Sequence, residues 1–199
     1  MGKNNAYLKS SSSPKSDECL TPRYGVLPIV KHLKAKGYKK IWCPFDQCNS
    51  MFVRVLQAEG FIVHCSHLGN GYDFFKYNPR FFVPDCIVSN PPFSCKDEVL
   101  KRLYEIGLPF AVILPQNALQ SLKRVNMFMQ HGMEYLGFDR RICYYTRGEL
   151  NYWPSANHFA SAYYCKDVLP ERMQFEKLEP IQEPYFYDRT PIYNQDESS

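Results

Sequence analysis

Residues 85–94 read Asp-Cys-Ile-Val-Ser-Asn-Pro-Pro-Phe-Ser, and the fold is decided here. An apolar, β-favouring run ends at Asn90, and two prolines and a phenylalanine follow it. Proline has no backbone N–H for a neighbouring strand, so the strand must stop at Asn90. An isolated Asn-Pro-Pro-Phe would most simply be a turn. Whether residues 90–93 are only a turn or part of a functional site therefore depends on the predicted strands and helices around them.

Strands and helices alternate on both sides of this stretch. A helix is expected from about Arg23 to Ala35, although Pro28 is unfavourable inside it. Strands are expected near 39–43, 61–68, 86–89 and 109–115, helices near 50–60, 95–107 and 117–132, and two further β segments at 133–146 and 158–165. This alternation predicts an α/β fold with a mostly parallel, doubly wound sheet. The terminal β pair should be antiparallel, because its linker is too short for a crossover helix.

In such a sheet, ligands bind beyond the carboxyl ends of the strands. That rule brings together the loop after Cys43, the loop after His67 and residues 90–93. The loop from Thr146 to Asn157 lies over the same face if the strand through Tyr144 is parallel to the others.

The composition favours one packed domain. Apolar residues make up 45% and aromatics 16% of the 199 residues, which is typical of a globular protein. Residues 1–18 read as a flexible basic lead-in and 19–169 as the domain. Residues 170–199, acidic and punctuated by proline, read as a tail.

Positive charge is concentrated near the start of the sequence. Residues 1–40 contain nine lysines or arginines against two acids, while the net charge of the chain is only +4. Such a segment can lie along a phosphate backbone and release counterions. A solvated basic segment without a partner is an equally good interpretation.

The eight cysteines stand singly, and we expect them to be reduced thiols in a cytoplasmic protein. No signal peptide precedes them, and no stretch has the length of a membrane span. Cys43 and Cys48 lack metal-ligand spacing, so no metal site is expected.

Three further motifs accompany Asn-Pro-Pro-Phe in a fixed order. They are Thr-Pro-Arg-Tyr-Gly-Val at 21–26, Cys-Pro-Phe-Asp at 43–46 and Tyr-Asp-Phe-Phe at 72–75. With them, the chain resembles S-adenosylmethionine-dependent amino-methyltransferases of Rossmann-like fold. The nearest likeness is to adenine-specific (N6) DNA methyltransferases, including small phage-encoded ones. The resemblance spans about residues 19–165.

The resemblance implies a catalytic role for Asn90 and its neighbours. The Asn90 side-chain oxygen and the Pro91 carbonyl would accept the two N–H bonds of an exocyclic amine, and so direct its lone pair toward a methyl donor. Pro91 and Pro92 would hold that carbonyl in place. Phe93 would stack on a base flipped out of the duplex.

Binding roles also follow from the resemblance. S-adenosylmethionine would be held by Thr21, Pro22, Pro44, Phe45, Asp46, Asn49, Ser66 and Asp73. Nucleic acid, with DNA as the first choice, would be held by Phe93, Arg147, Tyr152 and Trp153.

The first loop departs from the family. Residues 46–50 contain no glycine, and no carboxylate follows the second strand to bind ribose. Asn49 tolerates a left-handed backbone, and Asp46 or Ser66 can take the ribose role. Two alternatives stay open: a methyltransferase acting on RNA or on protein glutamine, and a non-catalytic relative. The latter would bind nucleic acid through lysines 31, 34, 36, 39 and 40.

Overall fold

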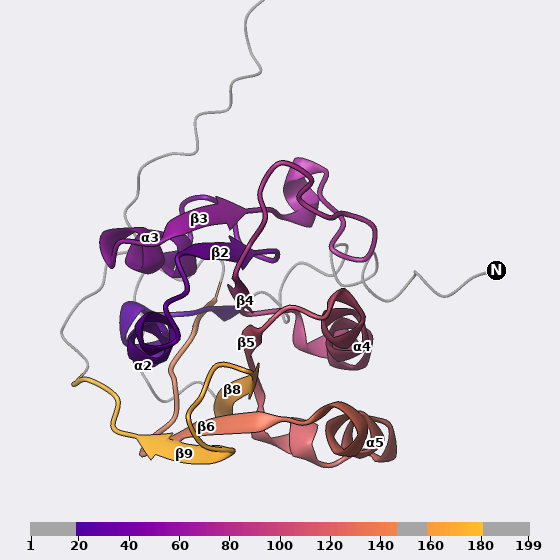
Figure 1. Cartoon of the computed structure of the whole chain (residues 1–199). Coiled ribbons are helices and arrows are strands. Elements are labelled where there is room, and N and C mark those ends of the chain that lie inside the picture. Colours follow the sequence, from indigo (N-terminus) through magenta and orange to yellow (C-terminus); the bar gives the residue numbers. More distant parts are fainter. Residues whose placement is uncertain (1–18, 147–158, 181–199) are drawn as a thin grey trace, which may run out of the picture.

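The structure is a computed structural model that describes residues 19–146 and 159–180. Its centre is a seven-stranded sheet in the order β3-β2-β4-β5-β8-β6-β9 (Figure 1). The strands are β2 (Lys40–Cys43), β3 (Ile62–Cys65), β4 (Cys86–Ser89), β5 (Phe110–Pro115), β6 (Glu134–Phe138), β8 (Ser161–Lys166) and β9 (Met173–Glu176).

The sheet is mostly parallel, as predicted. Strands β3, β2, β4 and β5 pair in parallel, and so do β6 and β9. Strand β8 alone runs the opposite way, because it is antiparallel to both β5 and β6. The terminal pair β6 and β8 is therefore antiparallel, as expected. The reversed strand lies inside the sheet, since β6 and β9 follow it toward the edge.

Helices cover both faces of the sheet, which confirms the doubly wound arrangement. In Figure 1, α2 (Arg23–Ala35) and α3 (Met51–Ala58) lie on one side, and α4 (Lys96–Ile106) and α5 (Leu122–His131) on the other. Pro28 lies inside α2 without ending it. The helix expected over 117–132 is split into a short 3-10 turn, η3 (Gln116–Leu119), and α5.

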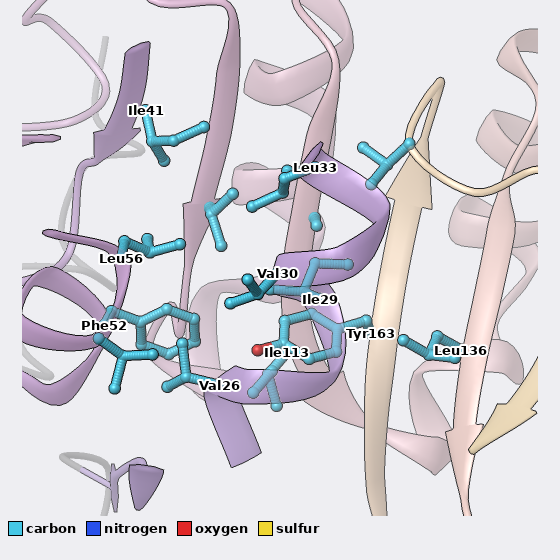
Figure 2. Close-up of a cluster of buried hydrophobic side chains, with 14 of the residues drawn as sticks. Val26, Ile29, Val30, Leu33, Ile41, Phe52, Leu56, Ile113, Leu136 and Tyr163 are labelled. Carbon is cyan, nitrogen blue, oxygen red and sulfur yellow. The ribbon is translucent and has the colours of Figure 1, made fainter. Parts of the chain in front are cut away.

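The strand side chains alternate between two cores. Ile41, Val88 and Ile113 face α2 and α3, whereas Trp42 and Ile87 face α4. Figure 2 shows the first core, where Ile29 and Leu33 of α2 and Phe52 of α3 gather with Ile113 and Tyr163 of the sheet. Burial of this much apolar surface is the main stabilising contribution to such a domain.

A separate two-stranded sheet lies beside the main one. Strand β1 (Cys19–Leu20) pairs antiparallel with β7 (Tyr145–Thr146). The single β segment expected over 133–146 is therefore split. Its first part, β6, runs parallel to β5 in the main sheet, whereas Tyr145 and Thr146 belong to the small sheet. The loop that follows, 147–158, is outside the described residues.

The folded part continues beyond residue 169, where we expected a tail to begin. Strand β9 pairs with β6, and Leu178 is 3% exposed in the first core. Glu176 of β9 contacts α2 through Nε2 of His32 at 2.6 Å and Nζ of Lys31 at 2.9 Å. The boundary at 169 was wrong because β9 is stabilised by pairing with β6, and a pairing between distant segments cannot be read from the composition of residues 170–180.

In the part of the chain that the structure describes, no helix combines the length and the apolar character needed to cross a membrane.

Candidate functional site

The candidate site lies at the carboxyl edge of the sheet. Strands β2, β3, β4 and β5 all end there, so the segments 44–50, 66–67, 90–93 and 116–119 meet at one edge. Strand β8 begins at the same edge because it runs the opposite way, and the Gln116 amide donates to the Ala160 carbonyl at 2.8 Å.

Residues 90–93 leave β4 at this edge and enter the short 3-10 turn η2 (Phe93–Cys95). Asn90 is half-buried and its side-chain oxygen is buried, while Pro91 is fully buried. The Pro92 carbonyl accepts from the Cys95 amide at 3.3 Å, and the Phe93 carbonyl accepts from Lys96 Nζ at 3.1 Å. These bonds fix the segment against the first turn of α4.

Ser89 joins this segment to the first loop. Its hydroxyl donates to the Asp46 carboxylate and accepts from the Phe45 amide at 3.3 Å. The carboxyl of Asp46, 7% exposed, also receives a hydrogen bond from Ser50. Burial raises the pKa of Asp46 to about 6, although both serine hydrogen bonds act in the opposite direction. The buried Asp46 carboxyl, with its raised pKa, is thus hydrogen-bonded to Ser89, the residue that directly precedes Asn90.

The expected acidic turn at 72–75 is packed on the same loop. The rings of Phe45 and Phe74 lie 4.7 Å apart between centroids. Asp73 stabilises its own turn, because its Oδ1 accepts from the Phe75 amide at 3.0 Å and its Oδ2 lies 3.4 Å from Lys76 Nζ. The turn is thereby held close to the first loop.

The Thr-Pro segment also reaches this region. Thr21 is 4% exposed, and its hydroxyl has no hydrogen-bond partner among the described residues. A Cβ on Gly25 would lie 3.0 Å from the Thr21 methyl group, and the Gly25 carbonyl accepts from Tyr163 Oη at 2.9 Å. The pKa of Tyr163 is raised mainly by burial, with smaller contributions from Tyr144, Cys165 and Asp46.

Three aromatic rings form a wall beside residues 90–93. The Phe93 ring lies edge-on to Phe159 at 5.4 Å and to Tyr144 at 6.2 Å, and Tyr144 stacks on Phe159 at 5.8 Å. The Tyr144 and Ser161 hydroxyls are hydrogen-bonded at 2.6 Å, which fixes this wall to the start of β8. Such edge-to-face arrangements are favourable for aromatic groups.

The other residues predicted for the site are placed as follows. Pro22 is the buried N-cap of α2, Pro44 is buried in the first loop, and Asn49 is exposed. Ser66 is buried after β3, and its hydroxyl accepts from Trp42 Nε1 at 2.9 Å. Arg147, Tyr152 and Trp153 lie outside the described residues.

The lysines considered for nucleic-acid binding lie away from this edge or are paired. Lys31 is paired with Glu176, and Lys34 Nζ lies 2.6 Å from a Glu59 carboxylate oxygen. Lys39 and Lys40 are at the amino end of β2, which is the opposite edge of the sheet. Lys36 is the C-cap of α2. Within the described residues, Lys39 and Lys40 thus lie away from the candidate site, and Lys31 and Lys34 are held in ion pairs.

Not all cysteines are reduced. Cys48 of the first loop and Cys65 at the end of β3 form a disulfide with a Cα–Cα distance of 5.6 Å. The expectation of eight free thiols was wrong because β2 and β3 are neighbours, so their carboxyl-end loops meet. The other cysteines that are described as free, at 43, 86, 95, 143 and 165, are buried. No cluster of three or more His, Cys, Asp or Glu within residues 19–146 and 159–180 could hold a metal ion.

Sequence reasoning missed Ser89, Tyr144 and Phe159. Ser89 directly precedes Asn90, so a polar residue at the end of a buried strand was the available signal. Tyr144 and Phe159 contact Phe93 from segments more than 50 positions away, and no spacing in the sequence predicts those contacts.

Comparison with known proteins gives little further information. No protein-family model and no curated protein match the sequence. One similar solved structure is the modification subunit of a proposed type I restriction enzyme from Vibrio vulnificus YJ016, with a TM-score of 0.46 and 9% identity. The match covers 90% of this chain and 51% of that one, so the chain spans about half the length of that subunit.

Proposed function

We propose that this protein transfers a methyl group from S-adenosylmethionine to the exocyclic N6 amine of adenine in DNA. The observation that carries the proposal is the link from Asn90 through Ser89 to the buried carboxyl of Asp46. Through Ser89, the Asn90 amide, which is suited to amine activation, is connected to the Asp46 carboxyl, which is suited to cofactor binding. Both lie where α/β sheets bind their ligands.

The residues at this edge fit the cofactor. S-adenosylmethionine presents an ammonium group, a carboxylate, ribose hydroxyls and an adenine ring. Asp46 can accept hydrogen bonds from hydroxyl or ammonium groups, and the unsatisfied Thr21 hydroxyl is a buried group of the kind that a ligand completes. The neighbouring turn at 72–75 supplies Asp73 and apolar surface for the adenine. When bound, the cofactor supplies an electrophilic methyl group.

Amine activation is assigned to Asn90 and Pro91. The Asn90 side-chain oxygen and the Pro91 carbonyl would each accept one N–H of the target amine, which weakens delocalisation of the nitrogen lone pair into the ring. Pro91 and Pro92 restrict the backbone, so the acceptors are positioned before the substrate arrives. After transfer, the more acidic nitrogen releases a proton to solvent.

The aromatic wall of Phe93, Tyr144 and Phe159 favours a planar substrate. Phe93 is half-buried, so part of its ring can stack on a base. Base–aromatic stacking contributes about 1–3 kcal/mol, comparable to the few kcal/mol needed to flip a base out of a duplex. We choose adenine among the bases with an exocyclic amine because residues 90–93 resemble the motif of adenine-specific methyltransferases.

The test has two stages. Calorimetric titration of the purified protein with S-adenosylmethionine should give micromolar binding. Labelled methyl transfer should then be assayed on DNA, RNA and protein, with N6-methyladenine identified by mass spectrometry after digestion of the DNA. Methylation of RNA or of protein glutamine alone would reassign the substrate. No cofactor binding, with or without DNA, would overturn the proposal.

A further inference from the structure

The Cys48–Cys65 bond spans two loops of the candidate site. Cys48 lies two residues after Asp46 and two before Ser50, which caps α3 and also bonds to Asp46. Cys65 ends β3 and directly precedes Ser66, whose amide donates to the Cys43 carbonyl at 3.1 Å. The bond thus holds the first loop against the neighbouring strand and joins two cysteines with a sequence separation of 17.

We propose that Cys48 and Cys65 are a redox-modification site whose oxidation fixes the first loop and strengthens cofactor binding. The effect on cofactor binding rests on the proposed function. Formation of the Cys48–Cys65 disulfide, which we call the clasp, does not. Its chemical partner is a low-molecular-weight disulfide of the glutathione type.

Position makes the oxidation selective. Cys48 is in an exposed part of the loop, and Cys65 is only half-buried, so a small disulfide can reach the pair. The free cysteines at 43, 86, 95, 143 and 165 are buried. Burial raises the pKa of Cys43, Cys86 and Cys165, which keeps these thiols protonated and poorly nucleophilic.

The reaction is an ordinary thiol–disulfide exchange. The Cys48 thiolate attacks one sulfur of glutathione disulfide, which forms a mixed disulfide and expels one glutathione thiolate. The Cys65 thiolate then attacks the Cys48 sulfur and expels the second. Two protein thiols are oxidised and one glutathione disulfide is reduced. The protons that the two cysteines lose are taken up, through solvent, by the two expelled glutathione thiolates, which gives two glutathione thiols.

The loop explains why the clasp would matter for binding. Residues 46–50 contain no glycine, yet this segment must hold Asp46 in place for a ligand. In the oxidised form, the loop is fixed at Cys48 by the disulfide and at Ser50 by the helix cap. Reduction removes the first of these constraints, and ordering the loop then opposes binding.

The experiment compares the full chain in reduced and in oxidised glutathione buffers. Alkylation of the protein unfolded in denaturant without reductant, followed by peptide mass spectrometry, should show that oxidation protects Cys48 and Cys65 and leaves the other thiols free to react. Amide hydrogen exchange of residues 44–50 should be slower in the oxidised form. Calorimetry should show about 3- to 10-fold tighter binding of S-adenosylmethionine by that form.

Variants complete the test. Cys48→Ser and Cys65→Ser should match the reduced wild type in both buffers, while the matched control Cys165→Ala, in buried β8, should keep the redox response. Equal hydrogen exchange in both buffers, or protection of other cysteines, would overturn the clasp, and equal affinities would overturn its effect on binding. Absence of cofactor binding in either form would instead overturn the proposed function, because alkylation and exchange report on the clasp without cofactor.

Discussion

The Ser89 hydroxyl donates a hydrogen bond to the Asp46 carboxylate, and so joins the end of β4 to the loop after β2. Both side chains are buried, and Ser89 is the residue immediately before Asn90. A displacement of the first loop would therefore be transmitted to the residue proposed to activate the amine. This coupling leads to the first two predictions.

Replacement Ser89→Ala should reduce both stability and cofactor affinity. It removes the donor to Asp46 and the acceptor for the Phe45 amide, so the unfolding free energy should fall by about 1–3 kcal/mol. The pKa of Asp46 should rise further. Chemical denaturation and calorimetry measure the two effects. Ser121→Ala is the control, because the Ser121 side chain makes no cap hydrogen bond to α5. Equal effects of the two changes would contradict a special role for Ser89.

The raised pKa of Asp46 predicts a specific dependence of stability on pH. The pKa is about 6 in the folded protein against a reference value of 3.8, so the folded state binds more protons between these values. Asp46 should therefore make stability fall as pH rises from about 4 to 6, by roughly 2–3 kcal/mol in total. Asp46→Asn should remove this contribution. Denaturation curves of both proteins at several pH values measure the difference, and parallel pH profiles would refute it.

Cofactor binding should have the opposite pH dependence, because the ionised Asp46 is the better acceptor. Affinity for S-adenosylmethionine should weaken as pH falls through about 6. In Asp46→Asn, it should be weaker at pH 7.5 and nearly independent of pH. Calorimetry at pH 5, 6 and 7.5 tests this, and an equally steep profile in the variant would assign the titration to another group.

Replacement Asn90→Ala should remove catalysis and spare cofactor binding. The side-chain oxygen is proposed to accept an N–H of the target amine, so kcat should fall about 10²- to 10³-fold, while the Kd for S-adenosylmethionine stays within about threefold. Single-turnover methyl transfer and calorimetry give the two numbers. Equal loss of both would mean that Asn90 has a structural role.

Replacement Phe93→Ala should weaken the binding of the substrate base. Loss of about 1–3 kcal/mol of stacking corresponds to roughly 5- to 150-fold higher KM for DNA, whereas Phe93→Tyr should retain most of the affinity. Phe175→Ala, at a side chain 69% exposed on edge strand β9, is the control for loss of an aromatic ring. Similar KM values for Phe93→Ala and the wild type would exclude stacking on this ring.

Truncation tests the revised C-terminal boundary. A chain of residues 1–180 should unfold like the full protein, because it keeps β9 and the buried Leu178. A chain of residues 1–169 should lose at least about 3 kcal/mol of unfolding free energy, since it lacks Leu178 and the Glu176 contacts with α2. Thermal denaturation of the two chains measures this difference. Equal Tm values would mean that residues 170–180 do not contribute to the stability of the domain.

The helices, the strands and their general arrangement could be predicted from the sequence alone. Apolar runs, the Ser50 cap, the stop at Gly107 and the prolines after Asn90 are local signals, and local backbone preferences act within a few residues. The predicted range of α2, the parallel strands β2 to β5 and the antiparallel pair of β6 and β8 agree with the structure for this reason. Placement of the loops at the carboxyl edge followed from the βαβ connections.

Which side chains meet at that edge became known only from the three-dimensional structure. Ser89 with Asp46, Cys48 with Cys65 and Phe93 with Phe159 are pairs from separate segments, and strand order and register bring them together. The same holds for the pairing of β9 with β6, because the two strands lie more than 30 positions apart in the sequence. Contacts of this kind depend on the summed packing of the whole sheet and not on any local run of residues, so no motif could have specified them.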